Sequence, residues 1–179
     1  LMLVMPSDHH IARPEVLQAA VATALPLAEA GWLVTFGITP DHPATGYGYL
    51  KMGAAIDAGR GQYRLDRFVE KPDLATAQGF LDQGGYAWNS GMFVMSAGRY
   101  LAELEKFRPD ILAAVKAAWS GRARDRDFCR LEAGEIERCI ARDGDAVGVA
   151  KCHADAREQL AHAEGLRQIV VGTRVEGED

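Results

Sequence analysis

The sequence predicts an α/β protein built around a parallel sheet, and stretches near the start of the chain carry this prediction. Residues 1–5 are a continuous apolar run that stops at a proline, typical of a strand buried on both faces of a sheet. Residues 14–28 place apolar side chains at helical spacing, with Pro14 suited to the first turn and Gly31 to the end of the helix. Residues 32–38 are a second apolar run. A strand, a helix and a strand joined by short connections form a βαβ unit, whose two strands run parallel.

Composition sets the class of protein. The 179 residues are 48% hydrophobic and 25% charged, which is ordinary for one globular domain, and no internal domain boundary is expected. The net charge of −5 provides no basic surface for nucleic acid. No apolar run reaches the roughly 18 residues of a membrane-spanning helix, and no signal peptide is recognised. The three cysteines lack CxxC spacing and are interpreted as reduced thiols of a cytoplasmic protein. Because the chain starts inside an apolar run, we expect a fragment.

The middle of the chain departs from the alternation of strand and helix seen in residues 1–38. Prolines and glycines predict an irregular loop over residues 39–48, where glycine lets a ligand approach the backbone or simply forms a bulge. The glycine pair of residues 84–85 predicts the end of a short helix that Asp73 begins. The elements expected here are antiparallel strands over residues 49–52 and 63–69 around a turn at residues 59–61, a helix over residues 74–81, and a strand over residues 86–95 with a polar, glycine-containing interruption.

The remainder of the chain has weaker patterns. Ser96 and Pro109 are suited to begin two helices. The expected elements are helices through Leu104 and Trp119, a solvated loop over residues 121–126, weak helix over 127–140, strands over 146–150 and 166–171, a helix over 154–163, and a frayed end over 176–179.

The most informative short run is Glu70, Lys71 and Pro72. Pro72 cannot donate to a sheet ladder and favours an extended Lys71, so Glu70 and Lys71 are expected at the carboxyl end of a strand, where α/β folds bind ligands. A carboxylate accepts hydrogen bonds from sugar hydroxyls and an ammonium binds phosphate. Taken alone, the run is better explained as two solvated charges at an exposed strand end, so the rest of the chain must decide.

Two more residues are candidates for ligand contacts. Asp8 follows the first apolar run and is placed either to bind a metal ion or to cap the next turn. Asn89 lies inside a buried strand, where an unpaired amide costs about 1–3 kcal/mol, so it either contacts a ligand or pairs with nearby backbone.

Five short runs are spaced along the chain at defined separations. They are Val-Met-Pro-Ser-Asp-His at 4–9, Val-Thr-Phe-Gly-Ile at 34–38, Thr-Gly-Tyr-Gly-Tyr at 45–49, Phe-Val-Glu-Lys-Pro at 68–72 and Trp-Asn-Ser-Gly-Met-Phe at 88–93. In this order and at these separations they resemble the mannose-1-phosphate guanylyltransferases of the sugar-nucleotide pyrophosphorylase family. The resemblance covers residues 1–131, leaves residues 152–179 unassigned, and implies a partial nucleotidyltransferase domain over residues 1–179. It implies a Rossmann-like, mixed and mostly parallel sheet with helices on both faces.

The resemblance also implies a reaction, in which mannose 1-phosphate attacks the α-phosphorus of GTP to give GDP-mannose and pyrophosphate. Asp8 is then a catalytic Mg²⁺ ligand, and Lys71 a catalytic residue that contacts the sugar phosphate. Glu70 and Asn89 bind mannose hydroxyls. The segment Gly46, Tyr47 and Gly48 seats the sugar. A homo-oligomer is left open.

The sequence departs from the family in two places. A glycine-rich phosphate loop is not found, and the later run with a second metal carboxylate has only a faint counterpart around Asp143 and Asp145. Truncation, a changed reading frame and divergence all explain this, and we expect the isolated chain to be inactive. The alternatives are another sugar-1-phosphate nucleotidyltransferase, such as a thymidylyltransferase, and a catalytically silent sugar-nucleotide-binding or regulatory homologue.

Overall fold

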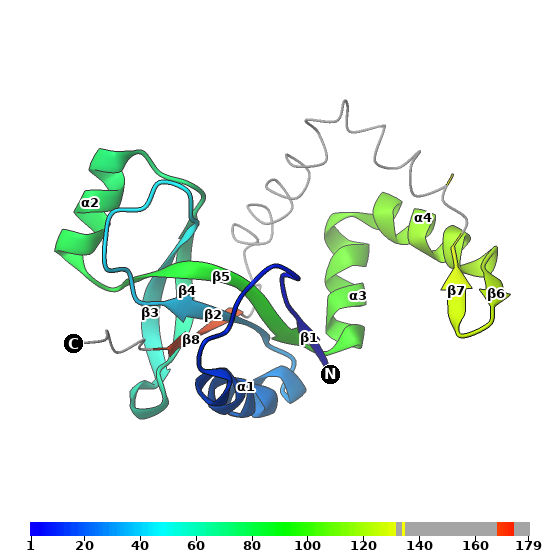
Figure 1. Cartoon of the computed structure of the whole chain (residues 1–179), viewed down its shortest axis with the longest axis horizontal. Helices are drawn as coiled ribbons and strands as arrows, with labels where there is room; N and C mark the ends of the chain where they lie inside the picture. The colour runs from blue at the N-terminus through cyan, green and yellow to red at the C-terminus, as the bar shows by residue number, and fades with distance from the viewer. Residues whose placement is uncertain (132–133, 135–167, 174–179) are drawn as a thin grey trace. The chain divides into compact units, whose positions relative to one another are not determined.

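The computed structural model describes residues 1–131, 134 and 168–173, and the chain divides into two compact units (Figure 1). The first unit comprises Leu1–Arg99 and Leu160–Asp179, and the second comprises Tyr100–Gln159. The predicted strand over 146–150 and the predicted helix over 154–163 lie outside the described residues.

The first unit is a mixed sheet, in agreement with the predicted α/β class. Its strand order is β1-β5-β2-β8-β4-β3, and β5 also pairs with β3. The 3₁₀ turn η1 (Ala58–Arg60) joins β3 to β4, and Gly61 follows it with a φ of +66°. The strands are β1 (Met2–Val4), β2 (Leu33–Ile38), β3 (Tyr49–Asp57), β4 (Gln62–Val69), β5 (Tyr86–Met95) and β8 (Gln168–Thr173).

The predicted parallel relation of the first two strands is correct, but another strand separates them. Both β1 and β2 pair antiparallel with β5, which lies between them. Among the described strands, β2 and β8 form the parallel pair and every other pairing is antiparallel. The expectation of mostly parallel pairing is therefore corrected for this part of the chain. The cause is that β5 returns antiparallel between β1 and β2, and that the hairpin strands β3 and β4 pair antiparallel with β5 and β8.

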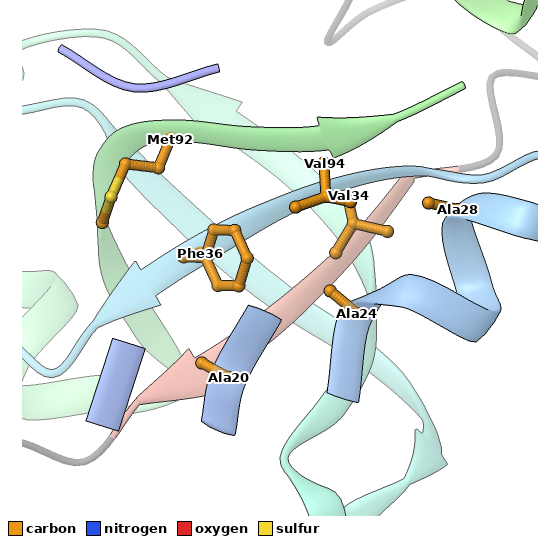
Figure 2. Packing of buried hydrophobic residues seen from close by; sticks show 7 residues of the cluster. All are labelled: Ala20, Ala24, Ala28, Val34, Phe36, Met92 and Val94. Carbon is orange, nitrogen blue, oxygen red and sulfur yellow. The ribbon is translucent and has the colours of Figure 1, made fainter. Parts of the chain in front are cut away.

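Helix α1 (Pro14–Glu29) covers one region of this sheet. Pro14 stands in its first turn, and Gly31 follows its end with a φ of +85°, as the sequence predicted. Three alanines of the helix are buried against β2 and β5, where small side chains let the helix approach the strands (Figure 2). The cluster consists of Ala20, Ala24, Ala28, Val34, Phe36, Met92 and Val94.

Helix α2 (Leu74–Gln83) packs on a second core that includes Tyr49, Phe80 and Trp88. Its predicted cap is confirmed, because the Thr76 N–H donates to Asp73 Oδ1 at 2.7 Å. Hydrogen bonds from the Thr76 side chain and, to a smaller extent, from its N–H lower the pKa of Asp73. By register, the β2 and β5 residues of both cores lie on one face of the sheet. Helices on the other face stay a prediction.

The first strand is not buried on both faces, contrary to the prediction. It has three residues, pairs only with β5 within the described chain, and forms an edge of the sheet. Leu3 and Val4 expose 45% and 46% of their surface. An apolar run predicts burial, but the neighbours that strand finds decide it.

The second unit is described through its helices and one hairpin. Ser96 Oγ accepts the Arg99 N–H at 3.1 Å, which confirms the predicted cap of the helix that begins at the next residue. The predicted loop over 121–126 and residues 127–130 of the predicted helix over 127–140 are corrected to a hairpin, whose turn holds Arg126 with a φ of +52° that reverses the chain. Most of the remaining predicted helix lies outside the described residues. The elements are α3 (Ala97–Phe107), α4 (Pro109–Ser120), β6 (Ala123–Asp125) and β7 (Phe128–Arg130).

Candidate functional site

Strand β4 ends at Val69, so Glu70 and Lys71 follow its carboxyl end as predicted. Lys71 Nζ lies 3.5 Å from Glu70 Oε1, and the Lys71 side chain is 62% exposed while that of Glu70 is 23% exposed. The partly exposed Glu70 carboxylate and the exposed Lys71 ammonium therefore place a hydrogen-bond acceptor and a cation side by side.

The backbone of Lys71 differs from the prediction. Its φ is +42°, in the left-handed region, and not the extended conformation that a following proline favours. The connection from β4 to α2 is only four residues long, so the chain must turn sharply here, and this requirement overrides the local preference. A lysine in this conformation is strained, and such strain is concentrated at functional sites.

Gly48 is buried beside Glu70, immediately before β3. A Cβ atom at Gly48 would lie 2.7 Å from Phe68 Cζ and 3.0 Å from Glu70 Oε2. The glycine is therefore required by close packing, because any side chain would displace the ring or the carboxylate. Gly46 is different, since a Cβ there would meet nothing within 4 Å.

Asn89 joins Gly48 from the neighbouring strand. Its N–H donates to Gly48 O at 2.7 Å. Its side-chain Oδ1 accepts the Gly91 N–H at 3.2 Å and the Thr35 hydroxyl at 3.1 Å, within a bulge where Gly91 has a φ of +71°. Because the Gly91 N–H needs an acceptor, the amide orientation is set, and Nδ2 has no recorded partner in the described part of the chain. The pairing of Asn89 with nearby backbone is therefore confirmed for Oδ1, and a ligand contact through Nδ2 stays a prediction.

The loop over residues 39–48 is held by aromatic contacts. The ring centroids of His42 and Tyr47 lie 4.8 Å and 5.1 Å from that of Trp88. The Tyr49 hydroxyl donates to Ala44 O at 2.9 Å, which fixes the middle of the loop. Tyr47 remains 51% exposed at the edge of this packing, so it is accessible to a ligand.

Asp8 stands apart from these residues in the contacts that the structure records. It lies exposed in the turn after β1. Pro6 Cγ is 3.5 Å from the position of a Cβ at Gly91, so the start of this turn lies against the bulge that follows Asn89. Within the described residues, no group of three or more His, Cys, Asp or Glu side chains could hold a metal ion. Magnesium commonly binds through one or two carboxylates, water and substrate phosphates, so the oxygen donor of Asp8 fits that ion as a single ligand.

We therefore define the strand-end cluster as Gly48, Glu70, Lys71 and Asn89. The sequence prediction missed two residues that support it, Phe68 and Thr35. Phe68 lies two residues before Glu70, which places it on the same face of β4 and could have been found from strand alternation. Thr35 is a polar residue in a buried strand, and its pairing with Asn89 follows only from the register of β2 with β5.

Polar residues at a strand end, on a mixed sheet with covering helices, are the arrangement in which α/β proteins bind ligands. Residues 1–136 match the family described as nucleotidyl transferase, and the chain belongs to this family.

Similar proteins agree with this assignment. The chain is 58% identical over 132 residues to the xanthan biosynthesis protein XanB of Xanthomonas campestris pv. campestris, which covers 74% of this chain and 27% of that protein. It is 50% identical over 142 residues to a mannose-1-phosphate guanylyltransferase of Escherichia coli K12, covering 78% of this chain and 30% of that protein. The chain thus spans less than a third of the length of these relatives.

Solved structures show the same fold. A structure titled mannose-6-phosphate isomerase from Helicobacter pylori matches with a TM-score of 0.69 and 30% identity, covering 96% of this chain and 60% of that one. A structure titled mannose-1-phosphate geranyltransferase, from Thermus thermophilus, matches with a TM-score of 0.65 and 28% identity, covering 96% and 44%. No helix among the described residues has the length and hydrophobicity to cross a membrane.

Proposed function

We propose that the chain carries the sugar-phosphate-binding part of a mannose-1-phosphate guanylyltransferase. The observation that supports this most is the convergence of Gly48, Glu70 and Asn89, which hydrogen bonds and close packing bring together beside Lys71. The names of several relatives point to the same activity. A homo-oligomer in the cytoplasm is part of the proposal.

The residues divide the work by their chemistry. Glu70 accepts hydrogen bonds from sugar hydroxyls, and Asn89 Nδ2 donates one, since its Oδ1 is already engaged. Gly48 keeps the surface beside Glu70 open. Lys71 extends its ammonium to the sugar phosphate, holding it for attack. Tyr47 and Gly46 border the sugar.

In the proposed reaction a phosphate oxygen of mannose 1-phosphate forms a bond to the α-phosphorus of GTP. The bond from that phosphorus to the bridging oxygen of pyrophosphate breaks, and pyrophosphate leaves with the electron pair. Asp8 would hold Mg²⁺, which neutralises charge on the phosphates when bound. The protein residues contribute by holding the sugar phosphate in line and limiting its motion.

Release of pyrophosphate tests this proposal. The complete enzyme should release it from GTP and mannose 1-phosphate with Mg²⁺, faster than with dTTP and glucose 1-phosphate. Faster release with the second pair would assign another sugar-1-phosphate nucleotidyltransferase. Binding of GDP-mannose without any release would assign a silent or regulatory homologue.

A further inference from the structure

Strand β5 carries a bulge directly after Asn89, and Thr35 of β2 lies opposite it. Register pairs Gly37 with Asn89 but Thr35 with Phe93. Two steps along β2 therefore span four along β5. A bulge of this kind disrupts the ladder and leaves backbone groups unpaired. In this bulge, side chains supply part of the missing hydrogen bonding.

The Thr35 hydroxyl contacts both ends of the bulge. Thr35 Oγ1 lies 3.1 Å from Asn89 Oδ1 and 3.2 Å from Met92 O. Both of these atoms are acceptors, so the hydroxyl hydrogen points to one of them or is shared between them. Thr35 is only 5% exposed, and its strand pairs on one side with β5 and on the other with β8. The hydroxyl is therefore held in place by the sheet.

Asn89 Oδ1 receives a second hydrogen bond, from the Gly91 N–H at 3.2 Å. Gly91 belongs to the same bulge and moves with it, whereas Thr35 belongs to the neighbouring strand. A single hydrogen bond lets an amide pivot about its oxygen, but two donors from different segments fix the oxygen and with it the direction of Nδ2. Asn89 is partly exposed, so Nδ2 is within reach of a ligand.

We propose that Thr35 is a positioning residue for sugar binding, and that it acts through Asn89. Its hydroxyl holds Asn89 Oδ1 against β2, so that Nδ2 has one direction before the sugar arrives. Ordering a side chain on binding costs affinity, and a donor that the sheet has already ordered avoids this cost. The inference rests on the proposed function, because it takes Nδ2 as the donor to a sugar hydroxyl.

A double-mutant cycle in the complete protein tests the inference, with the affinity for mannose 1-phosphate measured by calorimetry. Thr35→Val keeps the shape of the side chain but loses the hydroxyl, and should weaken binding about fivefold. In an Asn89→Ala background the same substitution should weaken it less than about twofold, because Thr35 then has no amide to position. Equal losses in both backgrounds, or no loss in either, overturn the inference.

Two matched variants separate positioning from stability. Thr35→Ser keeps the hydroxyl and loses a buried methyl group, so it should lower the melting temperature and still bind within about twofold of the unsubstituted protein. Ser90→Ala removes another hydrogen bond of the bulge, from the Met92 N–H to Ser90 Oγ at 3.2 Å, and should behave in the same way. Affinities that fall in parallel with the melting temperature in all three single variants would make Thr35 a structural residue only.

Glucose 1-phosphate is titrated beside mannose 1-phosphate, so that a failure of the proposed function is recognised separately. If the unsubstituted protein binds only glucose 1-phosphate, the mannose assignment fails and the cycle is evaluated with glucose 1-phosphate. Binding of neither sugar phosphate overturns the proposed function and the role of Thr35 together. Equal losses in both backgrounds, with a sugar phosphate that does bind, overturn the role of Thr35 alone.

Discussion

Glu70 and Lys71 of the strand-end cluster and Asp8 were all predicted from positions after strands, yet their surroundings in the structure differ. Gly48, Glu70 and Asn89 come from segments joined by hydrogen bonds and close contacts, so several strands define their geometry. Asp8 follows an edge strand of three residues and lies exposed. A residue after a strand therefore has a geometry fixed by several segments where neighbouring strands converge, and a less constrained one at an edge.

The largest expected effect is on turnover, and it tests Asp8 in the exposed turn after the edge strand. Asp8→Asn in the complete enzyme should lower turnover by about two orders of magnitude, because the amide keeps the shape but loses the charge that would hold Mg²⁺. Asp127→Asn, on the exposed hairpin turn, is the matched control. Full activity of Asp8→Asn at limiting magnesium would make Asp8 a turn residue only.

The next effect concerns Lys71, whose charge is expected to favour ligand binding while its backbone conformation lowers the stability of the fold. Lys71→Ala should weaken mannose 1-phosphate binding by about 1.5–3 kcal/mol, measured by calorimetry. Lys71→Gly should weaken binding similarly but raise the melting temperature, since glycine adopts a φ of +42° without strain. Unchanged affinity in both variants would remove Lys71 from the site.

Gly48 and Gly46 lie in the same loop, and their substitution by alanine is expected to affect stability differently. Gly48→Ala should destabilise the fold by about 1–3 kcal/mol, because the new Cβ meets Phe68 and Glu70. Gly46→Ala is the control for stability, since open space surrounds that position. Chemical denaturation of the two variants measures the difference, and equal stabilities would show that Phe68 moves aside easily.

Asn89→Asp separates the structural oxygen from the donor. A carboxylate can still accept the hydrogen bonds from Gly91 and Thr35, so the melting temperature should change little at neutral pH. Loss of Nδ2 should weaken mannose 1-phosphate binding by roughly 1 kcal/mol. Equal affinity to the unsubstituted protein would restrict Asn89 to a structural role.

The smallest effect concerns an ion pair of the second unit. Arg108 donates two hydrogen bonds to Asp110, which lowers the Asp110 pKa from 3.8 to about 2. A lowered folded-state pKa contributes stability above the ordinary value, and that contribution is lost as pH falls from about 4 towards 2. Asp110→Asn should cost less than about 1 kcal/mol at pH 7, since the pair is partly exposed. The difference between the two proteins in urea unfolding should shrink below pH 4.

Much of the local structure could be predicted from the sequence alone. The caps at Asp73 and Ser96, the glycine after α1 and the end of β4 depend on the chemistry of a few adjacent residues. Lys71 shows the limit of such reasoning, because a short connection outweighed the preference that Pro72 imposes.

The sequence by itself determined the α/β class, the positions of most helices and strands, and the residue types able to bind a sugar phosphate, because these follow from periodicity and functional groups. Only the tertiary structure decided that β5 separates β1 from β2, and that β1 is an edge. It also decided that Asn89 Oδ1 accepts the Gly91 N–H and the Thr35 hydroxyl. Strand pairing joins residues far apart in the chain, and register across several strands is not encoded in any one of them.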